Sequence, residues 1–129
     1  MKTLLLDTHT VLWFWWNDPQ LSSMANELIC DPANRKLVSI ASPWEVAIKV
    51  SRKKLDIGGP FSGFFNQHMV RTYFEWLPIA IKHLDGLADL PFHHGDPFDR
   101  MLAVQALSEN LSIVSADPQF DAYGVARLW

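Results

Sequence analysis

The sequence predicts an α/β fold built around a mainly parallel β-sheet. Short apolar runs bounded by turn residues, the pattern of buried strands, recur at residues 2–6, 37–40, 76–79 and 111–114. Segments with helical spacing separate these runs, and strands that alternate with helices favour parallel pairing. The length of 129 residues suits one core, so we expect a single domain over residues 1–129.

The first strand, residues 2–6, ends abruptly at Asp7 and Thr8. Residues 9–16 are apolar nearly all round, which is typical of a helix buried on more than one side. A serine at the start of residues 22–30 is expected to cap a second helix, which precedes the second strand.

A capping box is predicted directly after the second strand. Ser42 stands at the cap, Pro43 at the first helical position and Glu45 three residues after the cap. The helix is expected to run through Val50 into a basic end. Capping alone is one sufficient explanation of Glu45.

The second half repeats the alternation. Aromatic residues at helical spacing over 61–69 predict a helix, and Pro78 places the strand at 76–79 near its end or at an edge of the sheet. Residues 80–90 are expected to be helical, and residues 125–128 to add a last edge strand.

An acidic helix start lies at the centre of this half. Asp96 before Pro97 predicts a cap followed by a proline at the first helical position, and Asp99 falls in the first turn. The parallel with Ser42-Pro43 and Glu45 predicts that Asp96 is the cap and that Asp99 is the acid that faces a metal ion.

Composition limits the function classes. The net charge of −3 argues against binding of nucleic acid through the overall charge of the protein, although a local basic patch remains compatible with this net charge. A single cysteine, Cys30, excludes an internal disulfide, and no apolar run is long enough for a membrane span. We therefore expect a cytoplasmic protein that does not bind membranes.

Four acids from distant parts of the chain are expected to meet at one edge of the sheet. Asp7, Glu45 and Asp117 follow predicted strands, and ligands of open α/β sheets bind outside the carboxyl ends of the strands. Carboxylates without a cysteine or histidine set suit Mg²⁺ or Mn²⁺, which promote phosphodiester hydrolysis. Taken singly, each acid also has a structural explanation in capping or turn chemistry.

The motifs that carry these acids resemble the PIN domain, and more narrowly the VapC-type toxins of prokaryotic toxin–antitoxin pairs. The matching segments cover essentially the whole chain: residues 4–9, 42–49, 96–100, 115–120 and the 121–129 tail. The resemblance implies a three-layer α/β/α sandwich and a Mg²⁺- or Mn²⁺-dependent endoribonuclease. It places the catalytic, metal-holding acids at Asp7, Glu45, Asp99 and Asp117.

Further residues are candidates for support or substrate contact. The supporting candidates are Thr8, Ser42, Asp96, Arg100 and Ser115, and the candidates for contact with RNA are Lys49 and Arg52. The resemblance also implies a cognate antitoxin, and we expect a homodimer. Two alternatives stay open: a haloacid-dehalogenase-like phosphatase, disfavoured because His9 stands where that family has a second aspartate, and a non-catalytic PIN-like module that binds RNA or protein.

Overall fold

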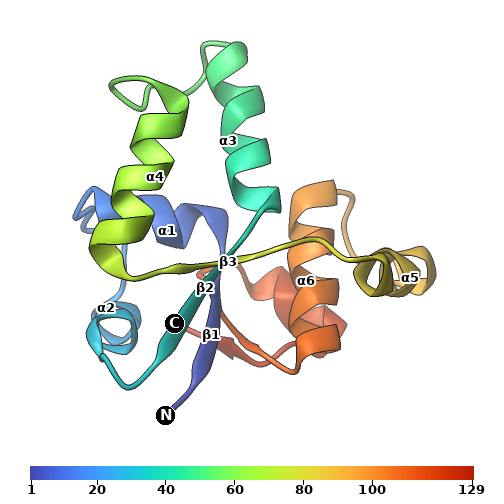
Figure 1. Ribbon diagram of the computed structural model, residues 1–129. Helices are drawn as coiled ribbons and strands as arrows, with labels where there is room; N and C mark the ends of the chain where they lie inside the picture. Colours follow the sequence, from blue (N-terminus) through green and yellow to red (C-terminus); the bar gives the residue numbers. More distant parts are fainter.

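The computed structural model describes residues 1–129 as a three-layer sandwich, with helices on both faces of one five-stranded sheet (Figure 1). The strands are β1 (Thr3–Leu6), β2 (Arg35–Ser39), β3 (Glu75–Leu77), β4 (Ser112–Val114) and β5 (Arg127–Leu128). They lie in the order β3-β2-β1-β4-β5, and every pair is parallel. The predicted α/β fold with a parallel sheet is confirmed.

Seven helices connect the strands. They are α1 (Thr8–Trp15), α2 (Ser23–Cys30), α3 (Ala41–Ser51), α4 (Phe61–Thr72), α5 (Ile81–Asp89), α6 (Pro97–Glu109) and the 3-10 helix η1 (Pro118–Tyr123). Helices α1, α2 and α4 lie on one side of the sheet and α5 and α6 on the other (Figure 1). No helix in the fold has both the length and the apolar character that crossing a membrane requires.

The central strand β1 supplies both halves of the core. Leu4 and Leu6 pack into the cluster with residues of α1, α2 and α4, whereas Leu5 packs into the cluster with α6 and η1. All three side chains are fully buried, and burial of a leucine contributes about 1.5–3 kcal/mol. An uninterrupted apolar run is what a strand covered on both faces needs.

The two edge strands are short. β3 ends one residue before Pro78, as the proline predicted, and β5 covers only two of the four residues expected at 125–128. Because successive strands are parallel, their carboxyl ends meet at one edge. The starts of α1, α3 and η1 lie at that edge.

The predicted capping box after β2 is wrong. Helix α3 begins at Ala41 with Ile40 as its cap residue, so Ser42 is already inside the helix. Ser39 accepts a hydrogen bond from the backbone N–H of Ala41 (3.0 Å), which gives an amide of the first turn a partner without a box. Glu45 is therefore not a capping residue, and helix capping does not explain its presence.

Candidate functional site at the carboxyl edge of the sheet

Asp7 lies where β1 passes into α1, and it is buried. Its Oδ1 accepts a hydrogen bond from the backbone N–H of Thr10 (2.8 Å), so Asp7 itself caps α1. Its Oδ2 accepts a hydrogen bond from the Ser115 hydroxyl. The Thr10 hydroxyl donates to the Val114 carbonyl (2.9 Å), which fixes the start of α1 to the end of β4. Asp7 is therefore a rigidly held carboxylate.

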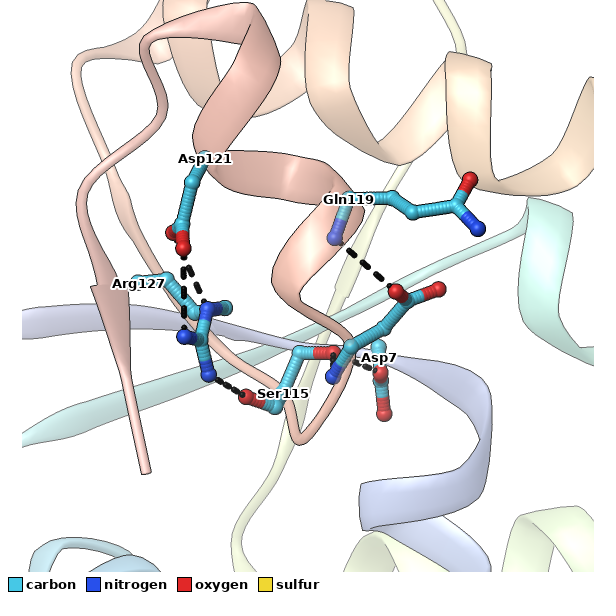
Figure 2. Close-up of polar contacts among 6 residues, drawn as sticks. Asp7, Ser115, Gln119, Asp121 and Arg127 are labelled. Carbon is cyan, nitrogen blue, oxygen red and sulfur yellow. Dashed lines mark hydrogen bonds and ion pairs between the residues drawn. The ribbon is translucent and has the colours of Figure 1, made fainter. Parts of the chain in front are cut away.

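Ser115 links Asp7 to Asp117. The Ser115 Oγ also accepts a hydrogen bond from the backbone N–H of Asp117 (3.0 Å), and Asp117 Oδ1 accepts one from the N–H of Gln119 (2.9 Å). Figure 2 shows Ser115 directed toward Asp7, and the Arg127 guanidinium joining Asp121 to the backbone of Ser115. The turn after β4 is thus tied to the first acid by a side chain that the sequence predicted as supporting.

Glu45 reaches the same edge from α3. The hydroxyls of Thr8 and Ser42 share a hydrogen bond (2.9 Å) that joins the starts of α1 and α3. Glu45 is buried and pairs with Lys49 one turn further on, with Nζ and Oε2 3.1 Å apart. Thr8 and Ser42 therefore hold two helix starts together, and no contact between either hydroxyl and an acid is present.

Asp96 takes the capping role that the sequence predicted for it. Asp96 Oδ1 accepts hydrogen bonds from the backbone N–H groups of Phe98 and Asp99, both at 2.9 Å, and is the cap of α6. Asp99 stands in the first turn, half-buried. The assignment of the cap to Asp96 is confirmed. Ser42 does not play the equivalent role in α3, so the predicted parallel between the two helix starts is wrong.

The charges of this edge act on Asp99 in particular. Burial, together with repulsion from Asp96, Glu45, Asp7 and Asp117, raises the pKa of the Asp99 carboxyl from 3.8 to about 7. Burial also raises the pKa of Asp7, against the opposing hydrogen bonds from Ser115 and Thr10. The predicted acids are therefore close enough to repel one another, and at Asp99 the repulsion is not offset by a cationic partner.

The side chains at this edge provide the kind of ligand atom that a hard cation prefers, but they are not arranged around one point. The acids provide only carboxylate oxygens, the ligands that Mg²⁺ and Mn²⁺ prefer. Cys30, the one thiol, is exposed at the end of α2. No three histidine, cysteine, aspartate or glutamate side chains form a group arranged to hold a metal ion. The Glu45 carboxylate is paired with Lys49 in this arrangement.

Arg100, a candidate for a supporting role, forms no ion pair with Asp99 and is not exposed. Its side chain is buried and donates to the carbonyls of Pro91 (2.8 Å) and Leu90 (3.0 Å) and to the Tyr123 hydroxyl (3.2 Å). The guanidinium carbon lies 3.8 Å from the centre of the Phe92 ring. Arg100 fixes the loop before α6 instead.

Tyr123 is a site-supporting residue that sequence reasoning missed. Its hydroxyl accepts hydrogen bonds from Arg100 and from the backbone N–H groups of His93 and His94 (3.3 Å each). It thereby ties the end of η1, the helix that Asp117 caps, to the loop that leads to Asp99. The only sequence signal was a buried-type aromatic in the tail, which does not indicate its partner.

The two candidates for contact with RNA differ in availability. Lys49 is occupied by Glu45 but keeps 40% of its side chain exposed, whereas Arg52 is exposed just beyond the end of α3. His93 and His94 pack their rings against Tyr123.

Comparison with known proteins matches these observations. A family model described as "PIN domain" matches residues 4–126. The chain is 28% identical over 119 residues to Ribonuclease VapC22 of Mycobacterium tuberculosis, covering 91% of this chain and 88% of that protein.

Solved structures share the fold at low sequence identity. VapBC2 from Rickettsia felis, bound to a promoter DNA fragment, superposes with a TM-score of 0.68 at 16% identity, covering 98% of this chain and 97% of that one. VapBC-1 from nontypeable Haemophilus influenzae gives 0.69 at 15% identity, with 98% and 96% covered. FitAcB from Neisseria gonorrhoeae gives 0.66 at 18% identity, again with 98% and 96% covered. The resemblance drawn from the sequence motifs is confirmed.

Proposed function

This chain belongs to the PIN-domain family, and we propose that it is a metal-dependent endoribonuclease, the toxin of a toxin–antitoxin pair. The ribonuclease named among its relatives supports the reaction class. The observation that carries the proposal is the electrostatic state of Asp99, whose carboxyl is crowded by four other acids without a cation to offset them.

The residues that would hold Mg²⁺ or Mn²⁺ are Asp7, Glu45, Asp99 and Asp117. A divalent cation bound there would supply a more acidic water and neutralise charge on the scissile phosphate. Asp7 is held for this task by Ser115 and Thr10, which fix both of its oxygens.

The protein groups around the acids supply position and proton control. With a pKa of about 7, Asp99 is close to half protonated at neutral pH, and a cation held by these acids would favour its ionised form. Lys49 lies beside Glu45, so release of that ion pair would leave a cation for an RNA phosphate. The Arg100–Tyr123 hydrogen bond keeps the loop before Asp99 and the end of η1 in register.

The experiment that tests the reaction class uses one preparation on three substrates. We expect cleavage of single-stranded RNA in Mn²⁺ or Mg²⁺, none in EDTA, and no turnover of a phosphomonoester such as p-nitrophenyl phosphate. Hydrolysis of the phosphomonoester with RNA left intact would favour a phosphatase. Tight RNA binding without cleavage in either metal would favour a binding module.

The partners follow from the same relatives. Two of the similar structures are named VapBC complexes, and we propose that an antitoxin chain binds this protein. Exposed apolar side chains on α5 and its neighbours, among them Ile81 at 73% and Phe92 at 82%, supply a surface for a second copy. Light scattering of the purified chain tests the dimer, and rescue from growth arrest by the adjacent upstream gene tests the antitoxin.

A further inference from the structure

An aromatic shelf lies beside the acids at the start of α1. The rings of His9 and Trp13 lie 5.6 Å apart, and the Trp13 ring lies 5.9 Å from that of Trp129, at the end of the chain. His9 is exposed and Trp13 half-buried, so both rings have a face that solvent reaches. We call this pair of rings, His9 and Trp13, the aromatic shelf.

The shelf shares one hollow with the acids. A cavity of about 250 Å³ is lined by both shelf residues together with Asp7, Ala116 and Asp117. A group that rests on the shelf therefore lies next to two of the carboxylates proposed to act on the scissile phosphate. This continuity separates the shelf from the aromatic residues that only fill the core.

A second hollow lies on the other side of the shelf. It measures about 300 Å³ and shares His9 and Trp13 with the first hollow. Its floor is apolar, formed by the buried side chains of Leu12 and Val46, and Trp16, 41% exposed, adds an aromatic wall. An apolar floor with aromatic walls receives a flat, weakly hydrated group.

Two lysines line the second hollow. Lys54 is exposed, and Lys49 pairs with Glu45 but keeps 40% of its side chain exposed. The first hollow is lined by Asp7 and Asp117, so the two hollows that share the rings differ in the charge of the side chains that line them. A ligand that carries a flat ring and an anionic group complements the second hollow.

We infer that the second hollow binds a nucleobase of the RNA next to the scissile phosphate, stacked on Trp13, with the adjoining phosphate beside Lys49 and Lys54. The inference rests on the proposed function, since it names a part of that substrate. Single-stranded RNA is recognised by bases that stack on aromatic side chains, and lysines neutralise the backbone between them. The geometry thus assigns substrate positioning to α1, beyond its role in supplying Asp7.

The test removes the base from the RNA and the ring from the protein, separately and together. The substrates are a short oligoribonucleotide that contains a mapped cleavage site and versions with one abasic nucleotide on either side of the scissile phosphate. The proteins are the wild-type chain, Trp13→Ala and Trp13→Phe, with Trp76→Ala as the control because Trp76, 37% exposed on β3, lines neither hollow. KM and kcat are measured for each combination.

At one of the two positions, we expect the abasic nucleotide to raise the wild-type KM by about tenfold or more, in line with stacking on an aromatic ring. Trp13→Ala should raise KM by a similar factor on intact RNA, and the abasic nucleotide should cause no further increase in the KM of this variant. Trp13→Phe should keep most of the wild-type affinity. Trp76→Ala should match the wild type. The inference would be overturned if Trp13→Ala and the abasic nucleotide raised KM independently, so that their effects multiplied when combined. It would also be overturned if neither abasic nucleotide changed the KM of the wild type.

A binding experiment keeps this inference separate from the proposed function. Asp99→Asn, which is expected not to cleave, is titrated with the intact and the abasic oligonucleotides in Mn²⁺. Weaker binding of the abasic RNA supports the stacked base even if the wild type does not cleave RNA, because absence of cleavage would contradict only the proposed function. Equal binding of the intact and abasic RNA would overturn the inference of a stacked base. Loss of antitoxin binding in Trp13→Ala, with RNA affinity unchanged, would assign the shelf to the antitoxin and overturn it as well.

Discussion

Replacing Asp99 with asparagine should stabilise the metal-free protein at alkaline pH while removing its activity. The pKa of Asp99 is raised from 3.8 to about 7, so ionising it in the folded state is unfavourable. Each pKa unit corresponds to about 1.4 kcal/mol, which gives an upper limit of about 4 kcal/mol for the cost of ionising Asp99 against burial and repulsion, a cost that asparagine removes. Because Asp99 is only half-buried, solvent screening reduces this to about 2 kcal/mol.

The opposing effect is smaller. A negative charge in the first turn of α6 interacts favourably with the helix dipole, and its removal costs about 0.3–1 kcal/mol. Asparagine is close to aspartate in shape, and Asp96 still caps the helix. The net change expected at pH 8 is therefore a stabilisation of about 1–2 kcal/mol.

The pH dependence follows from which state holds the proton. Between pH 3.8 and about 7 the folded protein keeps a proton on Asp99 that the unfolded chain has released, so the stability of the wild type falls as the pH rises through this window. The asparagine variant lacks this contribution. Its advantage should therefore be larger at pH 8 than at pH 5.

Urea denaturation in EDTA at pH 5 and pH 8 measures the effect. The difference in unfolding free energy between Asp99→Asn and the wild type should grow by about 1 kcal/mol or more between the two pH values. Asp121→Asn is the matched control, because Asp121 is exposed and its pKa is lowered by Arg127 instead. If Asp99→Asn shows the same pH dependence as the wild type, the carboxylates do not repel one another and the electrostatic account is wrong.

Other changes probe the supports of the site. Arg100→Met should cost about 2–4 kcal/mol in urea denaturation, because it removes the hydrogen bonds of a buried guanidinium to Leu90, Pro91 and Tyr123, and a loss below about 1 kcal/mol would contradict this role. Gly86→Ala should cost about 1–3 kcal/mol, since the new Cβ would overlap Val104 Cγ2. Gly63→Ala, with open space around it, should be neutral or stabilising by up to about 1 kcal/mol, and equal effects of the two substitutions would refute the close packing of α5 on α6. Saturating Mn²⁺ should raise the melting temperature of the wild type at pH 7.5, EDTA should reverse the gain, and Asp99→Asn should show a much smaller one.

Much of the fold follows from features that are local in the sequence. The run Leu4-Leu5-Leu6 is apolar at every position, which indicates a strand covered on both faces, and that strand is the centre of the sheet. Asp96 before Pro97 defines a helix start because both residues act on neighbouring backbone atoms. Predictions of this kind succeed because the interactions lie within a few residues.

The errors arise where distant partners decide the outcome. Ser42 has a cap-like spacing to Glu45, but Ser39 supplies a first-turn partner for α3 and the Ser42 hydroxyl faces Thr8 instead. Arg100 looked like a surface cation because its partners, the carbonyls before α6 and Tyr123, are not evident from the sequence. That several acids lie at one edge was predictable, because the carboxyl ends of parallel strands lie at the same edge of the sheet. The ion pair of Glu45 with Lys49 was not predictable, because the sequence allows several partners for either side chain.

The most direct test of the proposed site compares two neighbouring acids of α6 in one assay. Single-turnover cleavage of RNA in Mn²⁺ is measured for the wild type, Asp99→Asn and Asp96→Asn. Asparagine caps helices as well as aspartate does, so Asp96→Asn should keep its rate within a few fold of the wild type. Asp99→Asn should lose cleavage by a factor of about 100 or more, since a carboxylate that would hold the cation is removed. Cleavage undiminished in Asp99→Asn, or lost equally in both variants, would contradict the assignment of the site.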